Sequence, residues 1–206
     1  MSGARRGRLI ALEGIDGCGK STQAALLADH LGARLTFEPG ATPVGAALRQ
    51  LLLSPALPDV TPRAEALLMA ADRAQHVADV IEPLLAEGVS VVTDRFTGST
   101  LAYQGYGRQL DLAELRALNR LATAGTSPDV SVLIDVPLDV ARARMEPSRA
   151  DRLEGLGQAF QCRVRDGYLQ LVESDSGAWV RVDGTGDVDV VAERVRTAVA
   201  ERLEHA

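Results

Sequence analysis

A short glycine-rich segment, GIDGCGKS at residues 14–21, constrains the fold of this chain more than any other part of the sequence. It fits the pattern G-x-x-x-x-G-K-S/T without a mismatch, and the glycines of that pattern let backbone N–H groups turn inward around a phosphate. A short apolar run at 8–12 precedes the segment, and apolar residues at helical spacing follow it over 20–31. We therefore predict a phosphate-binding loop between a buried strand and a helix, rather than a glycine-rich turn that ends in Lys-Ser by coincidence.

The residues of this loop have separate expected roles. Lys20 reaches the terminal phosphates of a nucleoside triphosphate, and the hydroxyl of Ser21 binds Mg²⁺. The positive end of the helix dipole adds to the attraction for phosphate. The acid at the centre of the loop, Asp16, has no such role, and the loop alone does not explain it. The loop residues expected to bind ATP are Gly14, Gly17, Cys18, Gly19, Lys20, Ser21 and Thr22.

Strand-like and helix-like runs alternate along the rest of the chain. Strands are expected at 8–12, 34–37, 89–93, 130–136 and 179–182. Helices are expected at 20–31, 44–53, 61–87, 111–124, 138–145, 156–173 and 188–203. Pro83 is expected to bend the long helix near its end. This alternation is typical of an α/β fold, in which a parallel sheet has helices on both faces, and we expect a single domain over residues 1–206.

Composition and charge narrow the classes of partner. The net charge of −6 argues against a nucleic-acid partner, which favours a basic face, although local arginine clusters still allow a small anion to bind. The two cysteines, Cys18 and Cys162, lie far apart without the spacing of metal ligands, so a reducing compartment is expected. The apolar runs are too short for a signal peptide or a membrane span. We therefore expect a cytoplasmic protein without a membrane partner.

A second group of polar residues follows the strand expected at 89–93. Asp94 and Arg95 lie at the carboxyl end of that strand, where ligands bind in open α/β sheets. Asp94 is placed to hold Mg²⁺ or its waters and Arg95 to grip a phosphate, unless they are a helix cap and a solvated charge. Tyr103 and Gln104 come next, and an aromatic ring beside an amide suits a nucleobase and its sugar, although such pairs are common.

A set of segments in this order resembles the thymidylate kinase family: EGIDGCGKST, FEPGATP, LRQLLL, LLMAADRAQH, DRFTGSTLAYQG and SRADRLE. The likeness runs from Ile10 to about Trp179. It implies a P-loop NTPase fold of three α/β/α layers, with a five-stranded parallel sheet and a lid over about 146–154. It also implies that the γ-phosphoryl group of ATP passes to dTMP, giving dTDP, with Mg²⁺ and in a homodimer. The long helix from Pro62 is then a candidate dimer face, or it packs internally.

The resemblance also assigns the phosphate side of the acceptor. It places Asp16 near the 3′-hydroxyl of dTMP, which accounts for the acid in the loop. Glu38 belongs to the segment that lines the acceptor side. Arg49, Arg73 and Arg95 match positions that clamp the dTMP phosphate through charge-assisted hydrogen bonds.

The same resemblance assigns the sugar and the base. Tyr103 matches a residue that crowds the sugar 2′ position, Gln104 matches an amide that hydrogen-bonds the thymine edge, and Ser99 lies beside that edge. Family members commonly have Phe where this chain has Met69, and that ring stacks on thymine. The predicted dTMP-binding residues are Asp16, Glu38, Arg49, Met69, Arg73, Arg95, Ser99, Tyr103 and Gln104.

The small residue Cys18 in the loop matches those family members whose transfer-assisting arginine comes from the lid. We expect Arg149 to assist transfer and Arg152 to contact phosphate, unless either is a solvated lid charge. Arg142 and Arg144 match the helix where a family arginine packs on adenine, and we assign that role to Arg142. The residues expected to be catalytic are Lys20, Arg95, Arg149 and Asp16.

Departures from the family pattern leave alternative functions open. Met69 is polarizable and can lie against a base, but it lacks aromatic stacking, so weaker dTMP binding is expected unless Met69 is plain helix core. The alternatives are a kinase of the same fold for another deoxynucleoside monophosphate such as dUMP, or a catalytically inactive nucleotide-binding dimer. Phe37 and Ala41 also depart from the pattern, and nothing in the sequence explains either change.

Overall fold

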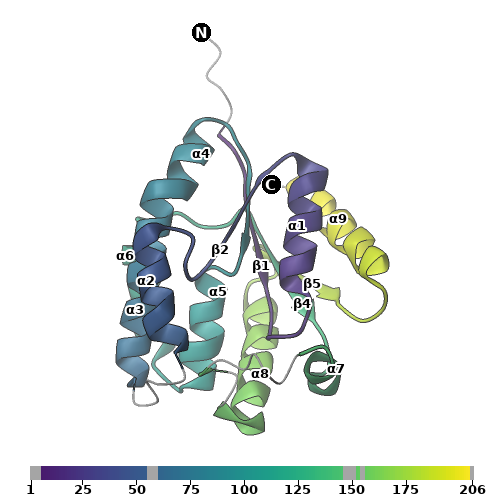
Figure 1. The fold of residues 1–206 in the computed structure, drawn as a ribbon. Coiled ribbons are helices and arrows are strands. Elements are labelled where there is room, and N and C mark those ends of the chain that lie inside the picture. Colours follow the sequence, from purple (N-terminus) through teal and green to yellow (C-terminus); the bar gives the residue numbers. More distant parts are fainter. Residues whose placement is uncertain (1–5, 55–59, 146–151, 154–155, 205–206) are drawn as a thin grey trace.

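The computed structural model describes residues 6–54, 60–145, 152–153 and 156–204. Its centre is a five-stranded parallel sheet in the order β2-β3-β1-β4-β5. The strands are β1 (Leu9–Glu13), β2 (Arg34–Phe37), β3 (Val91–Asp94), β4 (Val130–Asp135) and β5 (Trp179–Asp183). Helices lie on both sides of this sheet (Figure 1), so the predicted α/β fold is confirmed.

The helices form the two outer layers. In Figure 1, α1 and α9 lie on one side of the sheet, and α2, α3 and α6 lie on the other. The described α-helices are α1 (Lys20–Leu31), α2 (Pro43–Leu53), α3 (Pro62–His76), α4 (Glu82–Ala86), α5 (Thr97–Thr100), α6 (Leu112–Ala122), α7 (Leu138–Ala143), α8 (Gln158–Ser174) and α9 (Val188–Glu204). The π-helical segments are η1 (Val77–Ile81) and η2 (Leu101–Gly107).

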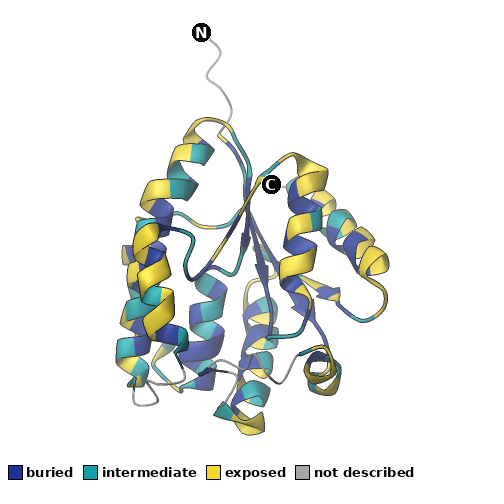
Figure 2. Ribbon diagram, viewed as in Figure 1, coloured by how far each residue is buried: buried dark blue, intermediate teal, exposed yellow. Residues whose placement is uncertain are grey.

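The central strand β1 explains why the site lies where it does. Its residues are all buried, as expected for a strand with neighbours on both edges and helices on both faces (Figure 2). Leu9 and Ala11 belong to one core cluster, whereas Ile10 and Leu12 belong to the other, because side chains alternate along a strand. The glycine-rich loop follows Glu13 directly. It therefore leaves the carboxyl edge of the sheet between β3 and β4, which is a favoured position for ligand sites.

The long helix expected over 61–87 is not a uniform α-helix. Regular turns run from Pro62 to His76 in α3, the wider π-helical turn η1 covers Val77–Ile81, and α4 begins at Glu82. Pro83 has no N–H to donate to the carbonyl four residues earlier, and that carbonyl lies in the wider turn, which ends two residues before Pro83. The irregularity therefore begins earlier than the bend predicted at Pro83.

The sequence predicts no helix over 97–107, yet α5 and η2 cover this segment. Its Thr- and Gly-rich start has low helix propensity. The segment is fixed from outside, because Glu13 Oε1 accepts hydrogen bonds from the N–H groups of Phe96 and Ser99 at 3.0 and 3.1 Å. A tertiary contact thus begins the helix that carries several predicted site residues.

The remaining elements lie close to their expected ranges. The largest shifts are of about two residues, as at β3, which begins at Val91 rather than at 89. Within the described ranges, no helix is both long enough and apolar enough to cross a membrane. The expectation of a single domain over the whole chain stays a prediction.

Candidate active site

The loop after β1 depends on glycine at two close positions. Gly17 has a φ of 79°, and a Cβ added there would lie 2.2 Å from the carbonyl oxygen of Ala141. Gly19 has a φ of 93° and directly precedes α1, whose N-terminus receives no capping hydrogen bond from the Gly19 position. The first backbone N–H groups of α1 are therefore suited to bind an anion.

Asp16 joins the loop lysine to Arg95. Lys20 Nζ donates to Asp16 Oδ1 at 3.2 Å, Arg95 Nη2 donates to the same oxygen, and the Tyr103 hydroxyl donates to Oδ2 at 2.7 Å. Burial raises the pKa of Asp16, but the charges of Arg95 and Lys20 outweigh burial and hold that pKa well below its usual range. Asp16 is therefore an ionised carboxylate that faces cations and a hydroxyl.

Ser21 and Asp94 form an oxygen pair beside the loop. The Ser21 hydroxyl donates to Asp94 Oδ2. Asp94 Oδ1 is buried and has no hydrogen-bond partner among the described residues. Mg²⁺ prefers oxygen ligands and is commonly held by one or two carboxylates together with phosphates and waters. The pair therefore fits the predicted metal site, although the described residues contain no group of three or more His, Cys, Asp or Glu that could hold a metal.

Arg95 is held in an unusual conformation at the end of β3. Its φ of 73° lies in the left-handed region, which is uncommon for a residue with a Cβ. The Thr93 hydroxyl donates to the Arg95 carbonyl at 2.9 Å, and Arg95 Nη1 donates to the Gly14 carbonyl and to Ser99 Oγ, both at 3.1 Å. Nη2 also donates to the Tyr103 hydroxyl at 3.2 Å. Such strained and tightly held residues cluster at functional sites.

Glu13, for which the sequence suggested no separate role, organises the surroundings of Arg95. Its Oε2 accepts from the hydroxyls of Ser99 and Tyr168 at 2.6 and 3.0 Å. With their protons on Glu13, both hydroxyl oxygens can accept from Arg95 Nη1, at 3.1 and 3.4 Å. Burial raises the pKa of Glu13. The available signal was a glutamate at the end of an apolar strand run, which places a carboxyl group in the core.

One cavity gathers all the residues predicted to bind dTMP. Its wall also contains Pro39, Leu53, Thr100 and Leu153, which were not predicted. The apolar residues Pro39, Leu53 and Leu153 give no sequence signal that separates a cavity wall from plain core. The predicted residues that line the cavity are Asp16, Glu38, Arg49, Met69, Arg73, Arg95, Ser99, Tyr103 and Gln104.

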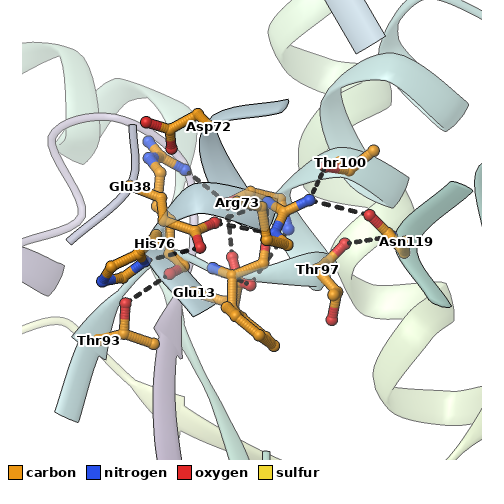
Figure 3. Close-up of polar contacts among 12 residues, drawn as sticks. Glu13, Glu38, Asp72, Arg73, His76, Thr93, Thr97, Thr100 and Asn119 are labelled. Carbon is orange, nitrogen blue, oxygen red and sulfur yellow. Dashed lines mark hydrogen bonds and ion pairs between the residues drawn. The ribbon is translucent and has the colours of Figure 1, made fainter. Parts of the chain in front are cut away.

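Arg73 braces the wall of this cavity and is 2% exposed. Nε donates to Glu38 Oε2 at 2.9 Å, and Nη1 donates to Thr100 Oγ1 and Asn119 Oδ1 at 2.8 and 2.9 Å (Figure 3). Nη2 donates to the Phe96 carbonyl at 2.9 Å and lies 2.8 Å from Glu38 Oε2. A phosphate would therefore have to displace a protein acceptor, so the expected phosphate contact of Arg73 stays a prediction.

Glu38 lies between Arg73 and a buried histidine. His76 Nδ1 is 2.9 Å from Glu38 Oε1, and His76 Nε2 is 2.6 Å from the hydroxyl of Thr36 (Figure 3 shows Glu38 and His76). Nearby, Asp72 Oδ1 accepts from the Gly40 N–H at 2.9 Å. Burial, followed by repulsion from Glu38, raises the pKa of Asp72 to about 6. This wall of the cavity is therefore a dense network of buried charges.

The structure explains one of the departures from the family pattern. Arg49 Nη1 donates to the Pro39 carbonyl at 2.7 Å, and the Arg49 guanidinium lies 6.0 Å from the centroid of the Phe37 ring. Phe37 therefore supports Arg49 through a cation–π contact. Met69 lines the cavity and also packs against the main core cluster, so its contact with the base stays a prediction. Nothing in the structure explains Ala41.

A second cavity lies along the glycine-rich loop. Loop residues 17–22 line it, as predicted for the ATP side. Gly184 and Gly186, in the turn after β5, also line it and were not predicted, although a Gly-Thr-Gly run after a strand was an available signal. Gly14 does not line this cavity; its carbonyl instead accepts the hydrogen bond from Arg95.

The arginine at this second cavity is Arg144 rather than Arg142. Arg144 Nη1 donates to the carbonyls of Gly184 and Cys18 at 3.2 and 3.3 Å. Arg142 Nη1 instead lies 3.4 Å from Gln158 Oε1, and Arg142 does not line the cavity. Residues two apart near a helix end point in very different directions, which explains why only one of them reaches the loop.

The expected lid lies largely outside the described residues, and Arg149 lies outside them entirely. Arg152 is described and is 8% exposed, so it is not a solvated charge. Its Nη2 donates to Glu65 Oε2 at 2.7 Å, and its Nε donates to the Leu52 carbonyl at 2.9 Å. The structure thus places Arg152 with Glu65 rather than at the loop cavity, because a fully buried carboxylate needs cationic partners.

Comparisons with known proteins agree with this geometry. The family model for thymidylate kinase matches residues 12–195. The thymidylate kinase of Geotalea daltonii is 46% identical over 96% of this chain and 98% of its own length. That of Trichlorobacter lovleyi is 47% identical over 94% of this chain and 97% of its own length. The crystal structure of thymidylate kinase from Ehrlichia chaffeensis has a TM-score of 0.78, with 31% identity over 95% of this chain and 99% of that one.

Proposed function

This chain belongs to the thymidylate kinase family, and from that premise we propose how its residues carry out phosphoryl transfer to dTMP. As a member of the family it is a dTMP kinase, which phosphorylates dTMP to dTDP with ATP as co-substrate. The observation that best supports the residue assignments is the single cavity that contains all the predicted acceptor residues. The alternatives of another acceptor or an inactive dimer are not favoured.

The donor binds in the loop cavity and the acceptor in the neighbouring one. Lys20 lines the loop cavity, whereas Asp16 and Arg95 line the acceptor cavity. Asp16 contacts both Lys20 and Arg95, so these groups connect the two cavities. Phosphoryl transfer depends on in-line positioning and on stabilising the negative charge of the transferred group. Lys20 and Arg95 supply the positive charge that stabilises it. Arg149 stays the predicted transfer-assisting residue.

Ser21 and Asp94 would hold Mg²⁺. The ion would neutralise the β- and γ-phosphate oxygens when it is bound. Oδ1 of Asp94 is buried and has no hydrogen-bond partner among the residues that the structure describes, and this supports the assignment, because a buried carboxylate oxygen without a donor suits a cation.

Different residues of the acceptor cavity contact the phosphate, the sugar and the base of dTMP. Arg95 and Arg49 meet the dTMP phosphate, and Asp16 meets the sugar beside the hydroxyl of Tyr103. Gln104 meets the edge of the base, and Met69 lies against its face. Arg73, Ser99 and Glu38 keep their predicted places in the acceptor set.

The protein acts as a homodimer through the face of α3 and α6. Leu67 on α3 is 59% exposed and Leu121 on α6 is 81% exposed. Large apolar side chains left this exposed on neighbouring helices support a second copy of the chain as the partner. The cytoplasmic location stays a prediction.

A coupled ADP-release assay tests the function. ATP and Mg²⁺ are supplied with dTMP, dUMP, dCMP, UMP or no acceptor, and we expect dTMP to give by far the highest kcat/KM. Lys20→Ala should abolish the signal. Equal rates with another monophosphate, or no acceptor-dependent release, would contradict the assignment.

A further inference from the structure

A fully buried carboxylate, Glu65 on α3, lies behind the acceptor cavity without lining it. Its Oε1 accepts from Gln104 Nε2 at 2.8 Å and from Arg108 Nε at 3.3 Å. Its Oε2 accepts from Arg108 Nη2 and from Arg152 Nη2, both at 2.7 Å. Glu65 therefore joins two guanidinium groups to the amide that lines the cavity. The transfer of phosphate does not use this group.

Glu65 stays ionised in this setting. Burial raises its pKa, but hydrogen bonds from Arg108, Gln104 and Arg152 outweigh burial and leave the pKa below its usual value. An ionised carboxylate can only accept hydrogen bonds. The Gln104 amide must therefore face Glu65 with its nitrogen, because the opposite orientation would place two acceptors against each other.

The anchored nitrogen decides what Gln104 offers to a ligand. Gln104 is 1% exposed and still lines the cavity, so only a small part of its head group is presented there. With Nε2 held by Glu65, the carbonyl Oε1 is the end left for the base, and it is a hydrogen-bond acceptor.

We propose that Glu65 is a specificity-determining residue, which fixes the Gln104 amide so that the cavity favours pyrimidines with an N3–H donor over cytosine. Thymine and uracil carry a proton on N3, which can donate to Gln104 Oε1. N3 of cytosine is itself an acceptor, so its lone pair would repel the lone pairs of Oε1. A site built around one hydrogen-bond polarity rejects a ligand of the opposite polarity strongly. This inference rests on the proposed function, in which Gln104 meets the edge of the base.

The test compares dUMP with dCMP, because both lack the thymine methyl group and differ at the base edge. In the wild type we expect kcat/KM for dUMP to exceed that for dCMP. Glu65→Gln allows the Gln104 amide to turn over, so we expect the dUMP:dCMP ratio to fall by at least about tenfold. Part of that change should be a gain with dCMP, which a merely destabilised enzyme would not show.

A double variant separates positioning from general damage. If Glu65 acts through Gln104, then Glu65→Gln should not change the ratio further once Gln104→Ala is present. Arg108→Gln removes a partner of Glu65 but keeps the Glu65–Gln104 contact, so it should lower the melting temperature and leave the ratio unchanged. Glu87→Gln, an identical change at an exposed position, is the matched control.

Folding of each variant is checked by circular dichroism and thermal melting. Where Glu65→Gln does not fold, Glu65→Asp is used instead. Asp keeps the charge, but its side chain is one methylene shorter, so the carboxylate lies farther from Gln104 and a smaller fall in the dUMP:dCMP ratio is expected. An unchanged ratio in a folded Glu65 variant would overturn the inference while dTMP activity of the wild type stands. Absence of dTMP activity in the wild type would instead overturn the proposed function.

Discussion

Asp16→Asn should destabilise the protein because it removes the charge that Lys20 and Arg95 share. The side chains of Lys20, Arg95 and Asp16 are 8%, 15% and 23% exposed. Removing one partner from a buried ion pair costs about 3–5 kcal/mol, since the opposite charge stays buried. The partial exposure of Asp16 lowers the expectation to about 2–3 kcal/mol at neutral pH. The amide of Asn would also turn a donor toward Arg95 or toward the Tyr103 hydroxyl.

The pH dependence of this loss has a definite sign. The folded protein holds the pKa of Asp16 below its usual range, so the carboxylate binds protons less readily in the folded state than in the unfolded chain. Its stabilising contribution is then complete above the unfolded-state pKa of about 3.9, and it fades as the pH falls toward the lower folded-state value. The gap in stability between wild type and Asp16→Asn should therefore be full at neutral pH and shrink under acid conditions.

Urea denaturation at neutral and at acid pH measures this gap, and steady-state kinetics with dTMP measures the accompanying loss of turnover. Asp29→Asn, on an exposed face of α1, controls for the chemistry of the substitution. If the free energy of unfolding of Asp16→Asn at neutral pH stayed within about 0.5 kcal/mol of wild type, the reasoning about a shared buried charge would be refuted.

Four further predictions, one of them with a paired control, have expected results of their own. Asp94→Asn should raise the Mg²⁺ concentration for half-maximal rate by at least about tenfold and leave the KM for dTMP unchanged. Arg144→Ala should raise the KM for ATP, whereas Arg142→Ala should not. Met69→Phe should lower the KM for dTMP about fivefold through ring stacking, and an unchanged KM would contradict a base contact. The folded protein raises the pKa of Asp72 to about 6, so the charge of Asp72 opposes folding increasingly as the pH rises through that value. The free energy of unfolding of Asp72→Asn, measured relative to that of the wild type, should therefore be about 1–2 kcal/mol greater at pH 8 than at pH 4.

Local patterns predicted the parts of the site that local geometry decides. The loop at 14–21 needs glycines with positive φ, a lysine and a hydroxyl in a fixed order, so its role can be predicted from residues that are adjacent in the sequence. Asp94 and Arg95 were readable because they end a β-branched run, and the carboxyl edge of a parallel sheet is where ligands bind. The resemblance to the family then brought the acceptor residues together, and the cavity contains them all.

The missed contacts join residues that are far apart in the sequence. Glu13 and Tyr168 are 155 positions apart, and Glu65 and Arg152 are 87 apart. Neither periodicity nor spacing can pair such residues, because the pairing follows from how the helices pack on the sheet. The same reason accounts for the observed position of Arg152, whose direction is set by a carboxylate on another helix.

Buried glutamates recur around the acceptor cavity, and their chemistry explains why. Glu13 accepts from Ser99, Glu38 from Arg73 and Glu65 from Gln104, so each orients a side chain of the cavity wall. Burying an ionised carboxylate costs several kcal/mol unless charge-assisted hydrogen bonds offset it, and an apolar replacement of similar volume can be as stable.

The gain from these carboxylates is therefore in orientation more than in stability. An acceptor-only group fixes which end of its partner faces inward, and the partner then has no need to reorganise when a ligand arrives. Glu38→Gln should accordingly raise the KM for dTMP as well as lower the melting temperature, because the buried Arg73 guanidinium loses the carboxylate that helps to orient it and balances its charge. A loss of stability without a change in the KM for dTMP would show that Glu38 serves packing alone.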